Sequence, residues 1–362
     1  MSLCPVTLNP ALQNVPLDYT NFRTLLETKY NDRIIQCKFA EIVTMKGYFN
    51  APVTNLFNNI KESREIIIKF EKYRRPSDRV SSVDLQPTAG QTCPSDVDID
   101  CAVDCTTTKP EYEVCSVLPD KLYKVGVSEC IRTKKLSMFD AEKELSENID
   151  AAGKMIEVES WNKLVCEVVN NPVALPTMGL TCLAETYHDF GAAPIYAALT
   201  QAIFDLKRVF GNGLTLFAHP YLESLLLGPD SDLHQYSSSG IPTAWGNADV
   251  YSNFDYKKMP AIPQLWGTDL VIVNDSPDYY GINSPTDNMH PFLSEDGSKF
   301  YVVFADRSAY YYDSMPLQDE VMYFGPQCDN ATQAWVKEWI TYHKLLCPEK
   351  VVVLAFDVPT CA

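Results

Sequence analysis

The chain has 362 residues, 46% of them apolar, and a formal net charge of -17 at pH 7. This length and apolar content predict a sizeable core and about two domains. The acidic balance excludes a dominant nucleic-acid-binding surface, and the sequence contains no run of about 18 apolar residues that would predict a membrane span. Met1–Pro5 lacks the cationic and apolar regions of a secretory signal, so we expect a soluble protein made in a cytoplasm.

Residues 1–33 contain scattered apolar residues and three prolines. The stretch Tyr19–Tyr30 predicts a short helix. Two interpretations of this segment are open. It is an extended arm that gains order on a neighbouring molecule, or it packs in the ordinary way against its own domain.

Two strand patterns flank a long polar stretch. Arg64–Tyr73 is rich in β-branched and aromatic residues, and Lys121–Val127 resumes a strand pattern about fifty residues later. We predict a projecting β-hairpin arm formed by these two strands; a surface insertion without regular structure is the alternative for its tip. The aspartates of the insertion do not form an EF-hand, because its sixth and twelfth positions are Cys101 and Thr107.

Twelve cysteines are present, five of them between Cys93 and Cys130. Cys101 and Cys105 have a zinc-like spacing, but no second pair of ligands follows at the usual distance. No export signal accompanies the cluster, so we expect free thiols. Cys166 and Cys182 stand in or beside apolar runs and are expected to stay reduced.

A long helix is predicted from Met138 to Asn170. Ser137 is a suitable N-cap, Asp140 favours the first turn, and Asn171-Pro172 ends the pattern. Apolar residues recur at spacings of three and four along one face, namely Met138, Ala141, Leu145, Ile149, Ala152, Ile156, Trp161, Val165 and Val168. Gly153 is a candidate bend or break.

The stretch from Pro194 to Asp275 predicts an ordered series of elements. A helix (Pro194–Phe210) stops at Gly211-Asn212-Gly213, and a buried strand (Leu214–Ala218) follows. A second helical patch (Tyr221–Leu227) comes after His219-Pro220. After a polar stretch, a turn at 262–267 leads to the strand Leu270–Val273, which ends in Asn274-Asp275.

The C-terminal third is predicted to be rich in strands. Phe300–Ala305 and Ser308–Asp313 form a predicted hairpin with Asp306-Arg307 as its turn. Trp335, Trp339 and Tyr342 share one face of a short element. The stretch Leu346–Leu354 is a proline turn followed by an apolar closing strand.

Catalytic signatures are absent from the sequence. The five histidines form no metal-binding pair, and no nucleophile elbow, phosphate loop or dinucleotide fingerprint occurs. His188 and Asp189 could be drawn as a catalytic dyad, although a structural or surface histidine is the ordinary interpretation. An enzyme with a cleft near these two residues stays open as an alternative function.

The succession of predicted helices and strands along the chain resembles the Hong Kong 97 fold of tailed-bacteriophage major capsid proteins, an α+β fold. The resemblance is carried by the long helix after the polar loop, by the order of elements in 194–275, and by the closing strand. It implies an N-terminal arm, an extended loop, a peripheral domain with a long spine helix, and an axial domain. The implied boundaries are 1–40 for the arm, 41–61 for the start of the peripheral domain, 62–127 for the loop, 128–184 for the peripheral domain with the spine helix, 185–295 for the axial domain, 296–345 for further peripheral strands and 346–362 for the closing axial strand.

The resemblance also implies a function. It predicts a non-enzymatic protein, without a cofactor, that self-assembles into pentamers and hexamers of an icosahedral shell around phage double-stranded DNA. The shell forms in the bacterial cytoplasm and becomes the virion, with portal and scaffolding proteins as further partners. An encapsulin-like compartment is the alternative within this fold. The expected subunit contacts are the arm, the charged strand of the loop and the axial tip, with Phe22, Lys69, Lys72, Arg74, Arg75, Tyr279 and Tyr280 as the residues.

Overall fold

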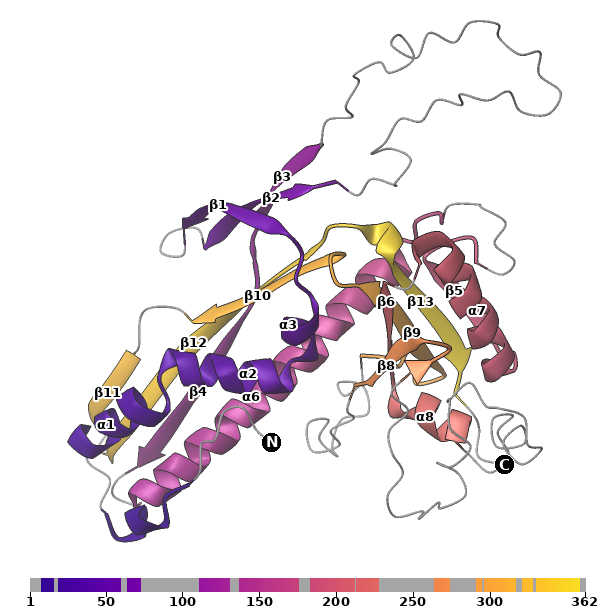
Figure 1. Ribbon diagram of the computed structural model, residues 1–362. Helices are drawn as coiled ribbons and strands as arrows, with labels where there is room; N and C mark the ends of the chain where they lie inside the picture. The colour runs from indigo at the N-terminus through magenta and orange to yellow at the C-terminus, as the bar shows by residue number, and fades with distance from the viewer. Residues whose placement is uncertain are drawn as a thin grey trace, which may run out of the picture. The chain divides into compact units, whose positions relative to one another are not determined.

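A computed structural model of the chain combines helices and β-sheets, which confirms the predicted α+β class (Figure 1). The chain divides into two compact units, one of Met1–Ala51 with Leu118–Ala362 and one of Pro52–Val117. The structure describes residues 8–15, 19–59, 64–72, 111–130, 137–175, 183–211, 213–227, 264–273, 291–294, 296–316, 321–327 and 330–358.

The long predicted helix is present as α6 (Met138–Asn170), and it is continuous over 33 residues. Ser137 caps it: the Asp140 amide donates to the Ser137 hydroxyl at 3.2 Å, and the Ser137 amide donates back to the Asp140 carboxylate at 3.1 Å. All nine residues of the predicted apolar face are buried. Gly153 neither ends nor interrupts the helix. It is buried against Ile42, and its missing side chain is what permits that close approach.

Short N-terminal helices pack on α6. They are η1 (Pro10–Asn14), α1 (Tyr19–Lys29), α2 (Asp32–Ile42) and α3 (Thr44–Tyr48). Figure 1 shows α2 lying alongside α6. Asn31 begins α2 by accepting a hydrogen bond from the Ile34 amide at 3.1 Å. Leu26, Tyr30, Ile35 and Phe39 are buried in this layer.

A four-stranded antiparallel sheet is built around one long strand, β12 (Asn330–Leu345). Its partners are β4 (Pro119–Cys130), β10 (Tyr310–Pro316) and β11 (Val321–Gln327). Tyr123 and Trp339, which are paired across β4 and β12, are both buried, and α6 packs on β4.

The six-stranded sheet has the order β5-β13-β9-β6-β8-β7. Its strands are β5 (Tyr187–Gly191), β6 (Leu214–Ala218), β7 (Gln264–Leu265), β8 (Thr268–Ile272), β9 (Lys299–Asp306) and β13 (Val351–Asp357), the last preceded by η3 (Pro348–Lys350). β6 and β13 are central strands and are almost wholly buried, as their continuous apolar runs predict.

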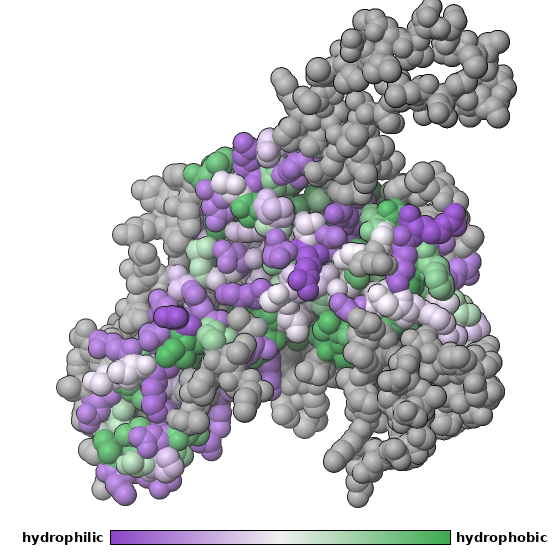
Figure 2. Space-filling model, viewed as in Figure 1, coloured by the Kyte–Doolittle hydropathy of each residue, from purple (hydrophilic) through white to green (hydrophobic). Residues whose placement is uncertain are grey.

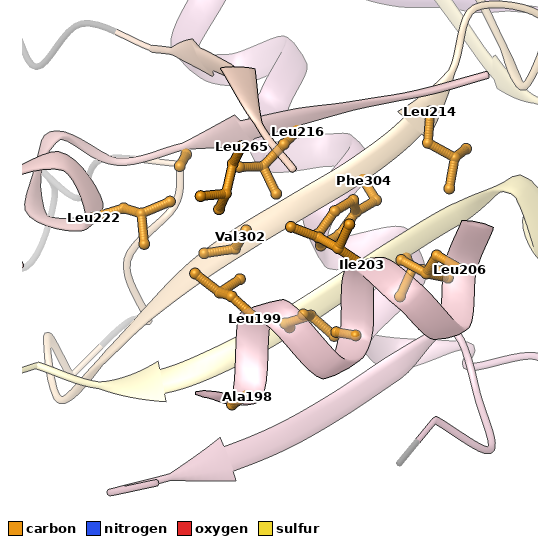
Figure 3. Packing of buried hydrophobic residues seen from close by; sticks show 14 of the residues in the cluster. Ala198, Leu199, Ile203, Leu206, Leu214, Leu216, Leu222, Leu265, Val302 and Phe304 are labelled. Atoms are coloured by element: carbon orange, nitrogen blue, oxygen red, sulfur yellow. The ribbon is translucent and has the colours of Figure 1, made fainter. Parts of the chain in front are cut away.

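Two helices, α7 (Ile195–Phe210) and α8 (Pro220–Leu227), complete this part of the chain. Figure 3 shows Leu199, Ile203 and Leu206 of α7 pointing toward Leu216 of β6 and Val302 of β9. α7 ends at Gly211, whose φ of +69° is a conformation that glycine adopts without steric cost. The predicted order helix, strand, helix, strand over 195–272 is therefore confirmed.

The unit Pro52–Val117 contains one antiparallel sheet with the strand order β1-β2-β3. β1 is Val53–Asn59, β2 is Glu65–Glu71 and β3 is Tyr112–Val117. Residues 73–110, which contain the predicted acidic loop and the Cys101 and Cys105 pair, lie outside the described residues.

Both predicted hairpins are corrected by the strand pairing. β2 pairs with β1 and β3, whereas Lys121–Val127 lies in β4 and pairs with β12. The chain does turn at Asp306, whose carbonyl accepts a hydrogen bond from the Ala309 amide at 3.0 Å. However, both edges of β9 are occupied by β6 and β13, so β10 enters the other sheet. The proposed group of peripheral strands at 296–345 is divided in the same way between the two sheets.

Two further expectations are corrected. The predicted one-face element at Trp335–His343 is part of the strand β12, where Trp339 and Tyr342 point to opposite faces because successive strand side chains alternate. Cys37 is disulfide-bonded, contrary to the expectation of free thiols, while Cys115, Cys166 and Cys347 are thiols. Cys166 is exposed on α6 rather than sheltered by its apolar neighbours in sequence.

Candidate subunit interface

The sheet of Pro52–Val117 has two different faces. Ile66, Ile68 and Phe70 of β2 are buried, and Ile66 pairs with the buried Val117 of β3. The intervening residues of β2 are only partly buried, which matches the period of two in its sequence. The face of this sheet that carries Ile66, Ile68 and Phe70 is therefore a buried, apolar face.

The other face of this sheet exposes apolar side chains. Tyr112 is 54% exposed and Val114 is 55% exposed on β3, and Leu56 of β1 is 53% exposed. Val114 is paired with Lys69, and the Lys69 ammonium lies 4.3 Å from the centre of the Tyr112 ring. This is a cation–π contact, worth about 0.5–1 kcal/mol at an exposed site. We call Leu56, Lys69, Tyr112 and Val114 the exposed face of the hairpin sheet.

The charges around this sheet are mixed in sign. Its described residues include the cations Arg64, Lys69 and Lys72, and the anions Glu65, Glu71, Glu111 and Glu113. Glu113 of β3 pairs with Phe70, the residue after Lys69 on β2, and the Lys72 amide donates to the Glu111 carbonyl at 2.9 Å. The described part of the predicted charged strand is thus not a basic patch.

The remaining predicted contact residues are only partly placed. Phe22 belongs to α1, but its side chain lies outside what the structure describes. Arg74, Arg75, Tyr279 and Tyr280 also lie outside the described residues. Their roles at a subunit contact stay predictions.

The described part of the predicted arm packs on its own unit. Glu142 of α6 is fully buried and accepts hydrogen bonds from the Lys29 ammonium at 2.8 Å and the Asn9 amide at 3.3 Å. The Met138 amide donates to the Val15 carbonyl at 2.9 Å. Burial and the neighbouring Glu142 charge raise the pKa of Tyr30 to about 12. The ordinary-packing interpretation therefore holds for the described residues 9–15 and 19–30.

A second exposed aromatic group lies on α7. Phe204 is 52% exposed, and its ring centre is 6.0 Å from that of Trp266. Trp266 has a φ of +51°, which is rare for a bulky residue, and its indole N–H donates to the Thr200 hydroxyl at 3.1 Å. On the surface in Figure 2, hydrophobic residues form small groups among hydrophilic ones.

The proposed dyad of the enzyme alternative has no dyad geometry. His188 and Asp189 are neighbours on the strand β5, so their side chains point to opposite faces. Asp189 pairs with Lys299, which lowers the pKa of its carboxyl, and also accepts from the Gly191 amide at 2.9 Å. His188 packs edge-on against Phe190, with ring centres 4.5 Å apart. These contacts are those of structural residues.

No group of histidine, cysteine and acidic side chains suited to a metal occurs within the described ranges. No described helix is long and apolar enough to cross a membrane.

Sequence reasoning missed β3 and with it Tyr112 and Val114. The signal was present in the alternation of Tyr112, Val114 and Ser116 with Cys115 and Val117. It was obscured because the surrounding fifty residues are polar.

No protein-family model and no curated protein matches the chain. Solved structures similar to it include the mature capsid of bacteriophage PhiM1, at 12% identity, 83% coverage of this chain, 84% of that chain and a TM-score of 0.44. A chain of Microbacterium phage Oxtober96 is 10% identical, with 87% and 91% coverage and a TM-score of 0.45. A virus-like particle from Pyrococcus furiosus is 11% identical, with 89% and 96% coverage and a TM-score of 0.38. At such identities and TM-scores, function is not transferred from these structures.

Proposed function

We propose that this chain is a major capsid protein that self-assembles into the pentamers and hexamers of an icosahedral phage shell. The order of its elements is the observation that supports this most. A separate hairpin sheet is followed by the 33-residue helix α6, then by the α7-β6-α8 series, and the C-terminal strand β13 joins the sheet that contains β6. The long helix after the loop, the helix-strand-helix series and the closing strand stand in the order that the resemblance implies.

The exposed face of the hairpin sheet suits a contact between copies. Neighbouring solvent-exposed apolar residues that form a contiguous patch are a mark of a surface that a second protein covers. Burying a side chain such as Val114 contributes about 1.5–3 kcal/mol per contact, and a shell repeats each contact in every subunit. Tyr112 adds an exposed aromatic ring, a type of side chain that is enriched at protein interfaces.

The net charge of -17 supports a container for DNA rather than a DNA-binding protein. An acidic wall repels phosphates, so that the polymer is enclosed without sequence-specific contacts. In this proposal, the shell assembles in the host cytoplasm, with portal and scaffolding proteins as partners.

The test is assembly of the purified chain, followed by sedimentation velocity and negative-stain microscopy. Shells, rings or sheets are expected at high protein concentration. A chain that stays monomeric at every concentration and salt condition tested contradicts the proposal.

A matched pair of variants tests the hairpin sheet separately. Val114→Lys places a second cation opposite Lys69 on this exposed face and should abolish assembly, because two ammonium groups would be desolvated side by side without an anionic partner. Val114→Thr keeps the shape and should assemble normally. Circular dichroism should show both variants folded. Equal particle yields from the two variants would show that this face of the sheet is not part of the interface between copies.

A further inference from the structure

The buried carboxyl of Glu157 is an unusual feature of α6. Glu157 is 7% exposed and lies in the apolar layer between α6 and α3. One carboxyl oxygen, Oε1, accepts a hydrogen bond from the Trp161 indole N–H at 2.9 Å and another from the Thr44 hydroxyl. The other oxygen, Oε2, is buried and has no hydrogen-bond partner. A charged carboxylate in this place is only partly compensated.

Glu157 contacts the start of α3 through the Thr44 side chain. The N-cap residue of α3 is Val43, whose side chain makes no capping hydrogen bond. The backbone amides of Thr44 and Met45 face the Glu157 carboxyl, and the Thr44 hydroxyl donates to it. The start of α3 is thus held by a side chain 113 residues away in sequence. Any change in that carboxyl acts on α3 directly.

The surroundings of Glu157 contain few charges. On α6 its neighbours are Ser160 and Trp161, and on α3 they are Thr44 and Lys46. The Lys46 ammonium donates to the Ser314 hydroxyl of β10 at 2.9 Å and has Asp313 as its charged neighbour. β10 also contributes Tyr312, and β12 contributes His343, whose ring centre is 5.1 Å from that of Tyr312.

We propose that Glu157 is a proton-operated latch that holds α3 against α6 when protonated and releases it when ionised. α3 ends at Tyr48, four residues before the unit Pro52–Val117 begins. The latch therefore acts on the segment through which the chain enters that unit. This inference concerns the single subunit and does not depend on the proposed function.

The direction follows from proton linkage. Burial raises the pKa of Glu157 from 4.5 to about 7. Between these two pKa values, protonation of Glu157 favours the state in which α3 is packed against α6. This stabilisation of the packed state is lost as the pH rises from 4.5 to 7. With these two pKa values, the equilibrium constant for opening α3 increases about tenfold between pH 6 and pH 8.

Amide hydrogen exchange of residues 44–50 at pH 6 and pH 8 measures this opening, after division by the intrinsic exchange rates. The wild-type segment should lose about tenfold in protection at pH 8, as the linkage calculation gives. The variant Glu157→Gln should show the same protection at both pH values. Glu147→Gln, at an exposed position of α6, is the control and should behave as wild type.

Two further measurements keep the test decisive if Glu157→Gln fails to fold. Thr44→Val removes a donor that lowers the Glu157 pKa, so its loss of protection should move to higher pH. Infrared difference spectra of the wild type should show the carboxylic-acid C=O band disappearing between pH 6 and pH 8. Unchanged wild-type protection would overturn the proposal. So would a response that survives in Glu157→Gln, because that variant retains Lys46, Asp313 and His343.

Discussion

Gly153 of α6 packs closely against Ile42 of α2, and its replacement by alanine tests that packing. An added Cβ would lie 2.8 Å from Cδ1 of Ile42, and 3.3 Å from both its Cβ and its Cγ2. The first contact is to the flexible end of the side chain, but the other two are to atoms near the α2 backbone. Ile42 must therefore move, or α2 must shift on α6.

Two opposing effects set the size of the change. Alanine is favoured over glycine inside a helix by about 1 kcal/mol. Overpacking of a well-packed contact costs about 1–3 kcal/mol. Because three contacts fall below 3.4 Å, we expect overpacking to exceed propensity. Gly153→Ala should lower the free energy of unfolding by about 1 kcal/mol net.

A double-mutant cycle with Ile42→Ala separates the two effects. The Ile42→Ala substitution removes Cδ1 and Cγ2, which leaves only the Cβ contact. In that background, Gly153→Ala should become stabilising by up to about 1 kcal/mol, so the coupling energy is about 1–2 kcal/mol. Urea titration of the unassembled subunit, followed by far-ultraviolet circular dichroism, measures all four free energies at constant m-value.

A stabilising effect of Gly153→Ala in the wild-type background would refute this reasoning. Zero coupling with Ile42→Ala would refute it as well, because the substitution would then act on helix propensity alone. Lys154→Ala, at an exposed neighbouring position of α6, is the control and should show no coupling with Ile42→Ala.

Two other predictions concern buried ionisable groups. Glu142→Ala removes the acceptor of the hydrogen bonds from the partly exposed Lys29 ammonium and the Asn9 amide. The substitution should therefore lower the free energy of unfolding of the subunit by about 1–3 kcal/mol and expose residues 9–30 to limited proteolysis. An unchanged cleavage pattern contradicts this prediction. Nδ1 of His343 lies 3.1 Å from the Tyr310 hydroxyl, and burial lowers the pKa of the His343 ring from 6.5 to about 4. The contribution of the neutral ring to the stability of the fold is therefore lost as the pH falls from 6.5 to 4. Relative to wild type, His343→Gln should therefore gain about 3 kcal/mol in unfolding free energy between pH 7 and pH 4, and parallel pH profiles would contradict it.

Much of the local structure follows from the sequence alone. The capping residue Ser137 and the apolar spacing of α6 identify its start, its end and its buried face, because a helix repeats every 3.6 residues whatever it packs against. The stop at Gly211 and the continuous apolar run of β6 are local in the same sense. Each depends on chemistry within a few residues, which a linear sequence contains.

Strand partners and side-chain partners depend on the tertiary structure instead. A turn at Asp306 was predicted correctly, but not that β10 leaves the sheet of β9, because β6 and β13 occupy both edges of β9. The same holds for the contact of Gly153 with Ile42 and for the Glu157 carboxyl at the start of α3. These contacts join residues far apart in the chain, and their energies come from exclusion of water and close packing. Those quantities exist only once the three-dimensional neighbours are in place.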